Sequence, residues 1–286
     1  MPELPEVETM RRGVTPIIGC KITRTSRPPC SRRPISIRPR IDVIDKRLSG
    51  RRIAEVSRRG KRVMIETDDD QILVIEPRMT GLVLLADPPT TDHLRLQLDL
   101  DHSIHKRLLF WDRRGLGTVR LYRRDEFTKI VDGKLGQDAM VVTEEELRRR
   151  LSTSRRAIKV ALLDQKAVAG IGNLYAAEIL YLAGIDPRTR CDRLSRPQWR
   201  RIVSSTREVL GMAIAHEGST LSDGTYRNAL NNEGGFQNHH RVYDREGLDC
   251  VRCDNGFIKR IVQAQRSTFF CPACQCKSGL HPSVVP

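Results

Sequence analysis

Four cysteines near the C-terminal end constrain the fold of this chain more than any other feature. Cys250, Cys253, Cys271 and Cys274 follow the spacing C-x2-C-x17-C-x2-C, which is typical of a zinc ribbon. Each C-x2-C turn presents two thiolates, and four thiolates around one divalent ion close a tetrahedron with no position left for a substrate. We therefore predict one structural zinc ion in a β-hairpin ribbon. Iron, disulfides or free thiols are the alternatives, and Cys276 could replace Cys274 as a ligand.

The positive charge narrows the class of partner. The chain has 50 Lys and Arg against 35 Asp and Glu, a formal net charge of +15 over 286 residues, which favours a polyanion such as nucleic acid. An acidic membrane surface is the alternative. We find no basic amphipathic anchor, lipidation signal or apolar run of about 18 residues, and the first residues do not resemble a secretion signal. We expect a cytoplasmic monomer with no membrane partner.

The N-terminal half has the pattern of a β-domain that begins with a helix. Residues 3–18 carry apolar side chains at helical spacing, and 20–40 are rich in Arg, Ser and Pro and predict an irregular basic loop. From about residue 41 to 122 the pattern changes to short alternating or apolar runs at 63–65, 72–75, 82–85, 94–98, 108–110 and 119–121. Gly, Pro and Asp separate these runs, so we predict strands of a sandwich or barrel.

Helical periodicity returns in the second half. Residues 144–151, 158–163, 174–183 and 195–216 predict four helices of an all-α domain. The glycine-rich turn 169–173 precedes the third of them, and its backbone amides could bind a phosphate at the helix start. An ordinary helix connection explains that turn equally well. Residues 218–248 predict a loop that leads into the zinc ribbon.

The start of the chain, Met1-Pro2-Glu3-Leu4-Pro5-Glu6, carries a candidate nucleophile. Removal of Met1 would leave the secondary amine of Pro2 free, with Glu3 and Glu6 close by. A free α-amine has a pKa of about 7.7–8.0, so a usable fraction is neutral at pH 7 without an activating base. Such an amine can form an imine with a sugar aldehyde. The alternative is an ordinary proline-led helix cap.

Three motifs together match a known family. Pro2–Thr9, Ile171–Ala176 and Cys271–Gln275 occur in the order and at the separations of bacterial formamidopyrimidine-DNA glycosylases, which the chain closely resembles from residue 2 to about 276. The resemblance implies an α+β multidomain protein: an N-terminal β-sandwich with an N-terminal helix (1–136), a helix–two-turn–helix domain (137–229), and a lesion-capping loop end with a C-terminal zinc finger (230–286). It also implies that DNA lies across a cleft between the halves.

The resemblance further implies an activity and its catalytic residues. We expect excision of oxidised purines (8-oxoguanine and formamidopyrimidines) from double-stranded DNA, then strand cleavage at the abasic site by β,δ-elimination, with zinc used only for structure. Pro2 is the expected nucleophile, Glu3 the general acid–base group and Glu6 a supporting carboxylate. Lys61 matches a hairpin lysine that acts near the sugar-phosphate. Arg266, counted with this set, matches a zinc-finger arginine that binds the phosphates flanking the lesion.

The resemblance also implies DNA-binding residues. Lys159 and Asn173 match phosphate-contacting positions, and so does His93, although a register shift of two residues would leave His93 with a structural role. A base must leave the duplex to be processed, and its space must be filled. Met79, Arg114 and Leu116 match the family's three void-filling positions.

Some positions depart from the family pattern. Leu116 stands where phenylalanine is common, so its stacking should be weaker. Glu76-Pro77 stands where His-Leu is common, which replaces a phosphate partner with a like charge. The loop that begins at Gly218 is also less typical, so the preference among oxidised bases is open.

Two other functions remain to be weighed. An endonuclease VIII-like enzyme would act on oxidised pyrimidines, but that branch usually has glycine at the position of Leu4. A non-catalytic damaged-DNA-binding protein would keep the charge and the zinc ribbon. Its binding role alone would not require Pro2, Glu3, Glu6 and Lys61 together.

Overall fold

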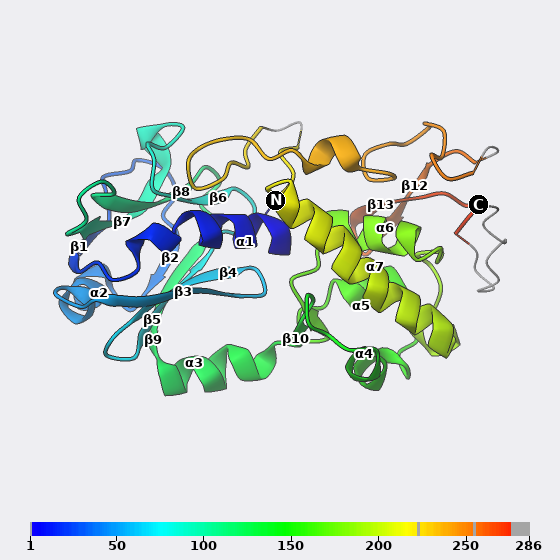
Figure 1. The fold of residues 1–286 in the computed structure, drawn as a ribbon, viewed down its shortest axis with the longest axis horizontal. Coiled ribbons are helices and arrows are strands. Elements are labelled where there is room, and N and C mark those ends of the chain that lie inside the picture. The colour runs from blue at the N-terminus through cyan, green and yellow to red at the C-terminus, as the bar shows by residue number, and fades with distance from the viewer. Residues whose placement is uncertain (1, 222–223, 254–255, 276–286) are drawn as a thin grey trace. The chain divides into compact units, whose positions relative to one another are not determined.

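The computed structural model describes residues 2–221, 224–253 and 256–275 (Figure 1). They form two compact units. The first contains the residues up to Lys134 together with Ala213–Gln237, and the second contains Leu135–Met212 together with the residues from Asn238 onward. Within the described ranges, no helix combines the length and apolar character needed to cross a membrane. Cys276 and Met1 lie outside the described residues.

Two β-sheets form the body of the first unit. The strands of the five-stranded sheet are, in order, β2 (Ser36–Arg38), β9 (Thr118–Arg123), β5 (Gln71–Glu76), β4 (Arg62–Thr67) and β3 (Ile53–Arg59). The strands of the four-stranded sheet are β1 (Ile22–Ser26), β7 (Leu94–Leu100), β8 (Arg107–Asp112) and β6 (Gly81–Leu84). Neighbours are antiparallel except for the parallel pair β2–β9. The predicted β-sandwich and its six predicted strands are confirmed.

The alternation of side chains along β4 and β5 explains how the five-stranded sheet is buried on both faces. Val63 and Ile65 point into the main core between the sheets, whereas Met64 points to the other face. Helix α3 (Arg124–Ile130) covers that outer face, where Phe127 packs with Met64 and Val74.

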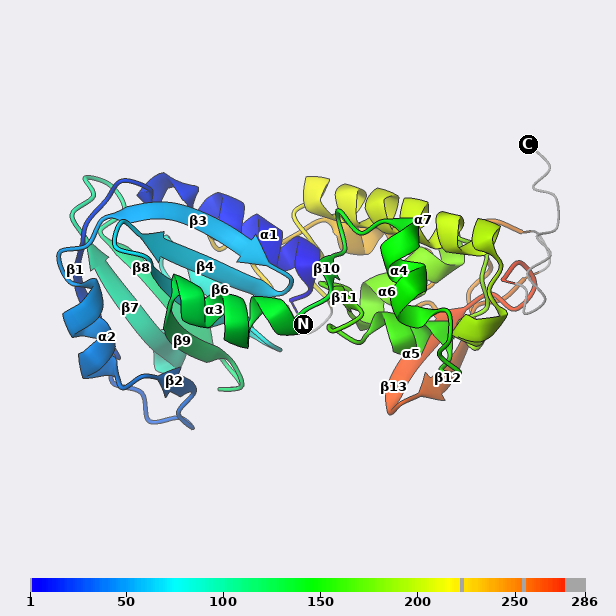
Figure 2. The same cartoon turned by 90° about the horizontal axis from the view of Figure 1, so that it is seen from below.

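Helix α1 (Leu4–Gly13) runs alongside β3 and β4 (Figure 2). Its Val7 and Met10 side chains lie in the core shared by both sheets. The predicted helix 3–18 ends earlier, because Pro16 has no amide hydrogen to continue it, and a short 3-10 turn follows at Thr15–Ile17. Gly13 is required where α1 ends, since a Cβ there would lie 2.4 Å from the Cβ of Ala229.

Two predictions for the first unit were wrong. The segment 20–40 is not wholly irregular, because β1 and β2 find partners in β7 and β9, far away in sequence. The segment that begins at residue 41 starts with helix α2 (Ile41–Leu48) rather than a strand. Ile44 and Leu48 are one helical turn apart and both are buried, a period that the short segment hid.

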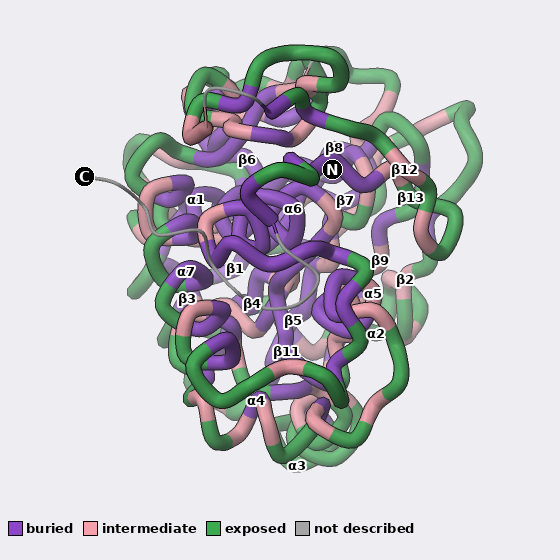
Figure 3. Tube along the Cα trace, turned by 90° about the vertical axis from the view of Figure 1, so that its right-hand side faces the viewer, coloured by how far each residue is buried: buried purple, intermediate pink, exposed green. Residues whose placement is uncertain are grey.

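The second unit contains the predicted helices α4 (Glu144–Leu151), α5 (Ile158–Leu162), α6 (Asn173–Leu182) and most of α7 (Arg196–Ala215). The Thr143 hydroxyl caps α4 by accepting the Glu146 amide at 3.2 Å. Helix α6 is buried along nearly all its length (Figure 3). The unit is not all-α as predicted, because β10 (Gln137–Asp138) and β11 (Val168–Ala169) form a short parallel pair.

The remaining elements are short. An antiparallel hairpin of β12 (Lys259–Gln263) and β13 (Arg266–Phe270) forms the ribbon of the second unit. Further 3-10 turns lie at Thr91–His93, Asp132–Lys134, Cys191–Arg193 and Phe236–His239.

Candidate active site and DNA-binding residues

The candidate nucleophile lies at the start of α1. Pro2 and Glu3 are buried, and Leu4 begins the helix, so the positive end of the helix dipole lies at these two residues. The Glu6 carboxylate accepts the Glu3 amide at 2.8 Å through Oε2 and the Ser219 amide at 2.9 Å through Oε1. Glu6 therefore joins the first residues of the chain to the segment that begins at Gly218.

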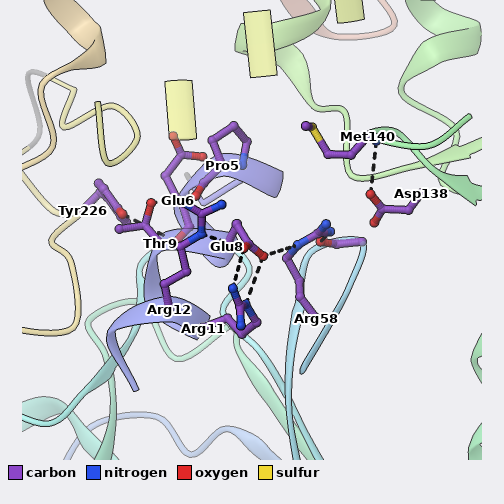
Figure 4. Close-up of polar contacts among 11 residues, drawn as sticks. Pro5, Glu6, Glu8, Thr9, Arg11, Arg12, Arg58, Asp138, Met140 and Tyr226 are labelled. Carbon is purple, nitrogen blue, oxygen red and sulfur yellow. Dashed lines mark hydrogen bonds and ion pairs between the residues drawn. The ribbon is translucent and has the colours of Figure 1, made fainter. Parts of the chain in front are cut away.

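That segment approaches Glu6 closely. Gly218 has φ +79°, and a Cβ there would lie 2.9 Å from Oε1 of Glu6, so glycine is needed on both counts. The Tyr226 hydroxyl donates to the Glu217 carbonyl at 2.9 Å. Burial, followed by the charge of Glu6, raises the pKa of Tyr226 well above its ordinary value, so this phenol stays neutral. Figure 4 shows Tyr226 and Glu6 beside Thr9 of α1.

The hairpin that carries Lys61 is fixed to α1. Gly60 and Lys61 form the turn between β3 and β4. Arg58 donates to the Glu8 carboxylate at 3.0 Å and to the Gly60 carbonyl at 2.9 Å. Arg11 also donates to Glu8, at 2.7 Å (Figure 4). The turn with Lys61 is thus held to the helix that begins just after Pro2 and Glu3.

Charge pairing keeps Glu8 ionised. Burial alone would raise the pKa of Glu8, but hydrogen bonds from Arg11, Arg12 and Arg58 outweigh it and lower that pKa. Glu8 was not predicted as a site residue, because its partner Arg58 lies 50 positions away in sequence.

The three predicted void-filling residues lie on two loops of the first unit. Met79 is half-buried in the turn between β5 and β6. Arg114 is exposed in the loop between β8 and β9, and the Leu116 side chain there is 38% exposed. Leu116 is thus one of the large apolar residues that the described part of the chain leaves exposed.

The acidic departure at Glu76 is compensated within the chain. Its carboxylate lies 3.5 Å from the Arg62 guanidinium and 3.3 Å from that of Arg78. Arg78 has φ +58° and its side chain is 54% exposed. Glu76 therefore holds two cations next to Met79 rather than presenting an isolated like charge.

His93 lies where cations gather. Its ring packs edge-on against Trp111 at 5.4 Å between centroids, and its buried Nδ1 has no hydrogen-bond partner among the described residues. Burial, followed by the charges of Arg95 and Arg32, lowers the pKa of His93. The lowered pKa favours the neutral form of the His93 ring.

In the second unit the predicted phosphate-binding residue Lys159 is buried. Its side chain is 1% exposed, and its ammonium donates to Oδ1 of Asn173 at 2.7 Å, the Ser267 carbonyl at 2.9 Å and Oγ1 of Thr268 at 2.6 Å. Asn173 also donates to the Ser267 carbonyl, at 3.0 Å. Lys159 and Asn173 thus join the start of α6 to β13. Arg266, the first residue of β13, is exposed.

The four predicted metal-binding cysteines converge. The sulfur atoms of Cys250, Cys253, Cys271 and Cys274 all lie within 4.8 Å of one another. Cys250 and Cys274 are 3.8 Å apart, and Cys253 and Cys271 are 3.6 Å apart. Zinc–sulfur bonds of about 2.3 Å in a tetrahedron require sulfur separations of about 3.8 Å, so the residues fit zinc.

Neighbouring residues support this cluster. Arg252 donates to the sulfur of Cys274 at 2.9 Å, and its guanidinium lies 4.2 Å from the centre of the Tyr181 ring. A nearby cation offsets the negative charge of four thiolates around one divalent ion. Gly256 is required beside them, because a Cβ there would lie 2.6 Å from the sulfurs of Cys253 and Cys271.

Comparison with known proteins divides the chain into three successive domains. Family models match three segments: the formamidopyrimidine-DNA glycosylase N-terminal domain at residues 1–119, the formamidopyrimidine-DNA glycosylase H2TH domain at 135–225, and the zinc finger found in FPG and IleRS at 247–275. With the four clustered thiols, the last match gives the chain one structural zinc site.

Whole-chain relatives agree. The formamidopyrimidine-DNA glycosylase of Chloroflexus aurantiacus is 40% identical over 280 residues, which cover 96% of this chain and 98% of the relative. A crystal structure of a Lactococcus lactis Fpg mutant with Fapy-dG containing DNA has a TM-score of 0.84 at 34% identity and covers 96% of this chain and 99% of its own. MutM in complex with carbocyclic 8-oxo-G containing DNA has a TM-score of 0.83 at 33% identity with the same coverage. The chain belongs to the formamidopyrimidine-DNA glycosylase family.

Proposed function

We propose that this protein is a bifunctional DNA glycosylase. It removes oxidised purines, 8-oxoguanine and formamidopyrimidines, from double-stranded DNA and cleaves the strand at the resulting abasic site. Family membership supports the glycosylase activity, and relatives with DNA containing Fapy-dG or 8-oxo-G support the class of lesion. Because its substrate is chromosomal, we place the enzyme in the cytoplasm with the nucleoid.

The chemistry begins at Pro2. The lone pair of its nitrogen attacks C1′ of the damaged nucleotide, and the bond from C1′ to the base breaks with the electron pair leaving on the base, which is then protonated. Ring opening gives an iminium ion, which acidifies the C2′ proton. Loss of that proton expels the 3′ phosphate, and a second elimination expels the 5′ phosphate. Water finally hydrolyses the iminium ion, which releases the sugar fragment as an aldehyde and restores the proline amine.

The carboxylates near Pro2 have different tasks. Glu3 is the proposed acid–base residue at the sugar. Glu6 accepts two backbone amides, so we assign it to holding the N-terminus in place rather than to proton transfer. Lys61 acts at the sugar-phosphate from a turn that Arg58 fixes to α1.

The remaining predicted residues bind DNA or metal. His93, Asn173 and Arg266 contact phosphates, and Lys159 acts through Asn173. Met79, Arg114 and Leu116 fill the space that the extruded nucleotide leaves. The zinc ligands are Cys250, Cys253, Cys271 and Cys274.

The observation that carries this proposal is the position of Pro2 at the buried start of α1. Pro2 is buried where the positive end of the helix dipole lies, next to the buried Glu3. Glu6 holds the adjacent Glu3 amide at 2.8 Å, so the two reactive residues share one rigid support.

Borohydride trapping tests the proposal. The protein, shown by intact mass to lack Met1, is incubated with borohydride and a duplex that contains 8-oxoguanine, and we expect a covalent adduct at Pro2. Pro2→Gly should lose base release together with trapping, whereas Pro5→Ala, a proline removed from the same helix start, should keep both. Undiminished turnover by Pro2→Gly would refute the mechanism. Trapping confined to a duplex with an oxidised pyrimidine would change the substrate class.

A further inference from the structure

Two loops of the first unit cross between its sheets side by side. The turn 77–80 leads from β5 in the five-stranded sheet to β6 in the four-stranded sheet, and the loop 113–117 returns from β8 to β9. Glu76 at the end of β5 pairs with Thr118 at the start of β9 in the five-stranded sheet. Gly81 at the start of β6 pairs with Asp112 at the end of β8 in the four-stranded sheet. The loops therefore begin and end opposite each other.

A buried carboxylate fastens these loops together. Asp112 is fully buried and accepts the Thr80 hydroxyl at 2.5 Å through Oδ1 and the Gly117 amide at 2.8 Å through Oδ2. The Thr80 oxygen in turn accepts the Arg114 amide at 2.9 Å. We call Thr80, Asp112 and these two backbone amides the Thr80–Asp112 clasp. Hydrogen bonds to an ionised acceptor in a dry site are among the strongest that side chains form.

Two glycines permit the close approach. A Cβ at Gly81 would lie 2.5 Å from the Pro77 carbonyl oxygen. A Cβ at Gly117 would lie 2.6 Å from the Phe110 ring and 3.1 Å from Oδ2 of Asp112. A side chain at either position would therefore force neighbouring atoms to move.

Every residue assigned to void filling is attached to this clasp. Met79 directly precedes Thr80, and Leu116 directly precedes Gly117, whose amide donates to Asp112. The backbone amide of Arg114 itself donates to the Thr80 hydroxyl oxygen. Arg95, which is 2% exposed, adds a support from β7 by donating to the Asp112 carbonyl at 2.9 Å. The exposed side chains therefore project from backbone that a common buried group holds.

We propose that Thr80 and Asp112 are positioning residues that set the spacing of Met79, Arg114 and Leu116 for insertion into DNA. The inference rests on the proposed function, because it takes these three residues as the void fillers. The clasp touches neither the substrate nor the reacting atoms. It holds the three side chains as one rigid wedge, so that they enter the duplex together when the damaged nucleotide leaves.

Near-isosteric changes at Thr80 test the proposal. Thr80→Val keeps the shape and removes the hydroxyl, whereas Thr80→Ser keeps the hydroxyl. Asp112→Asn keeps the shape and removes the charge. Each variant is mixed with an 8-oxoguanine duplex that carries 2-aminopurine next to the estranged base, and the fluorescence rise reports insertion. Single-turnover base release and borohydride trapping on a preformed abasic site are measured beside it.

We expect Thr80→Val and Asp112→Asn to slow the fluorescence rise and base release by about 10- to 100-fold, the cost of a misplaced group remote from the chemistry. Trapping on the abasic site should stay close to the wild-type rate, and Thr80→Ser should resemble wild type throughout. If Thr80→Val lowers the melting temperature but leaves fluorescence and base release unchanged, the clasp is only structural and the proposal is overturned. Absence of trapping in the wild type would instead overturn the proposed function.

Discussion

Replacing Lys159 by methionine separates two roles for this cation. A lysine that neutralises a phosphate releases a counterion, so its removal should reduce the slope of log K against log salt by about 0.9. The Lys159 ammonium is instead buried, and its three acceptors belong to Asn173, Ser267 and Thr268. We therefore expect Lys159→Met to weaken DNA binding without changing the slope.

The size of the effect follows from the hydrogen bonds that are lost. The Ser267 carbonyl keeps its bond from the Asn173 amide at 3.0 Å, whereas Oδ1 of Asn173 and Oγ1 of Thr268 each lose their bond to the ammonium. An unsatisfied buried acceptor costs about 1–3 kcal/mol, so Asn173 will turn to find another donor. A misdirected Asn173 should lower the affinity about tenfold, or about 1.4 kcal/mol, at every salt concentration.

Fluorescence anisotropy with a duplex that contains a stable abasic analogue, titrated over a range of salt, measures both quantities. Arg266→Ala is the matched comparison. Removing this exposed side chain should lower the affinity for DNA and should also reduce the slope of log K against log salt by about 0.9. Lys159→Met on an Asn173→Ala background should add little, because the two residues act through one contact. Zinc content shows that the variants fold. If Lys159→Met reduces the slope by about 0.9, Lys159 itself contacts a phosphate and the positioning role is refuted.

Three further outcomes are expected. Removing zinc with a chelator should release one equivalent per chain and abolish DNA binding, because Cys250 and its partner thiols lie in one cluster with Ile258 and Phe269; binding that survives zinc loss would contradict this. Gln265→Gly should raise the free energy of unfolding by about 1 kcal/mol in denaturant titrations, since Gln265 has φ +60°, and a decrease would argue against that turn. The pKa of Glu8 is lowered in the folded state, so its contribution to the free energy of unfolding is present above pH of about 4.5 and lost as the pH falls further. Glu8→Gln should therefore have a lower free energy of unfolding than the wild type at pH 7 and a similar one in acid. Parallel curves of unfolding free energy against pH would exclude the ion pair.

Several elements could be predicted because their signals are local. Metal-ligand spacing in C-x2-C turns depends on a few residues, and the predicted cysteines do converge. The strand runs from β4 to β9 and helix α4 were confirmed because their apolar periods extend over whole elements. The short strands β1 and β2 were missed, since their stability comes from partners elsewhere in the chain rather than from their own composition.

The sequence by itself determined the family, the order of the domains and the residue types at the candidate site. Tertiary structure decided which of the charged residues face solvent. Nothing in the sequence separates Lys159 from an exposed lysine, but two of its hydrogen-bond acceptors, on Ser267 and Thr268, lie 108 and 109 positions away in sequence. Asp112 likewise joins Thr80, 32 positions away. Burial and hydrogen bonding are properties of such long-range contacts, so only the folded chain separates an exposed charged residue from a buried one.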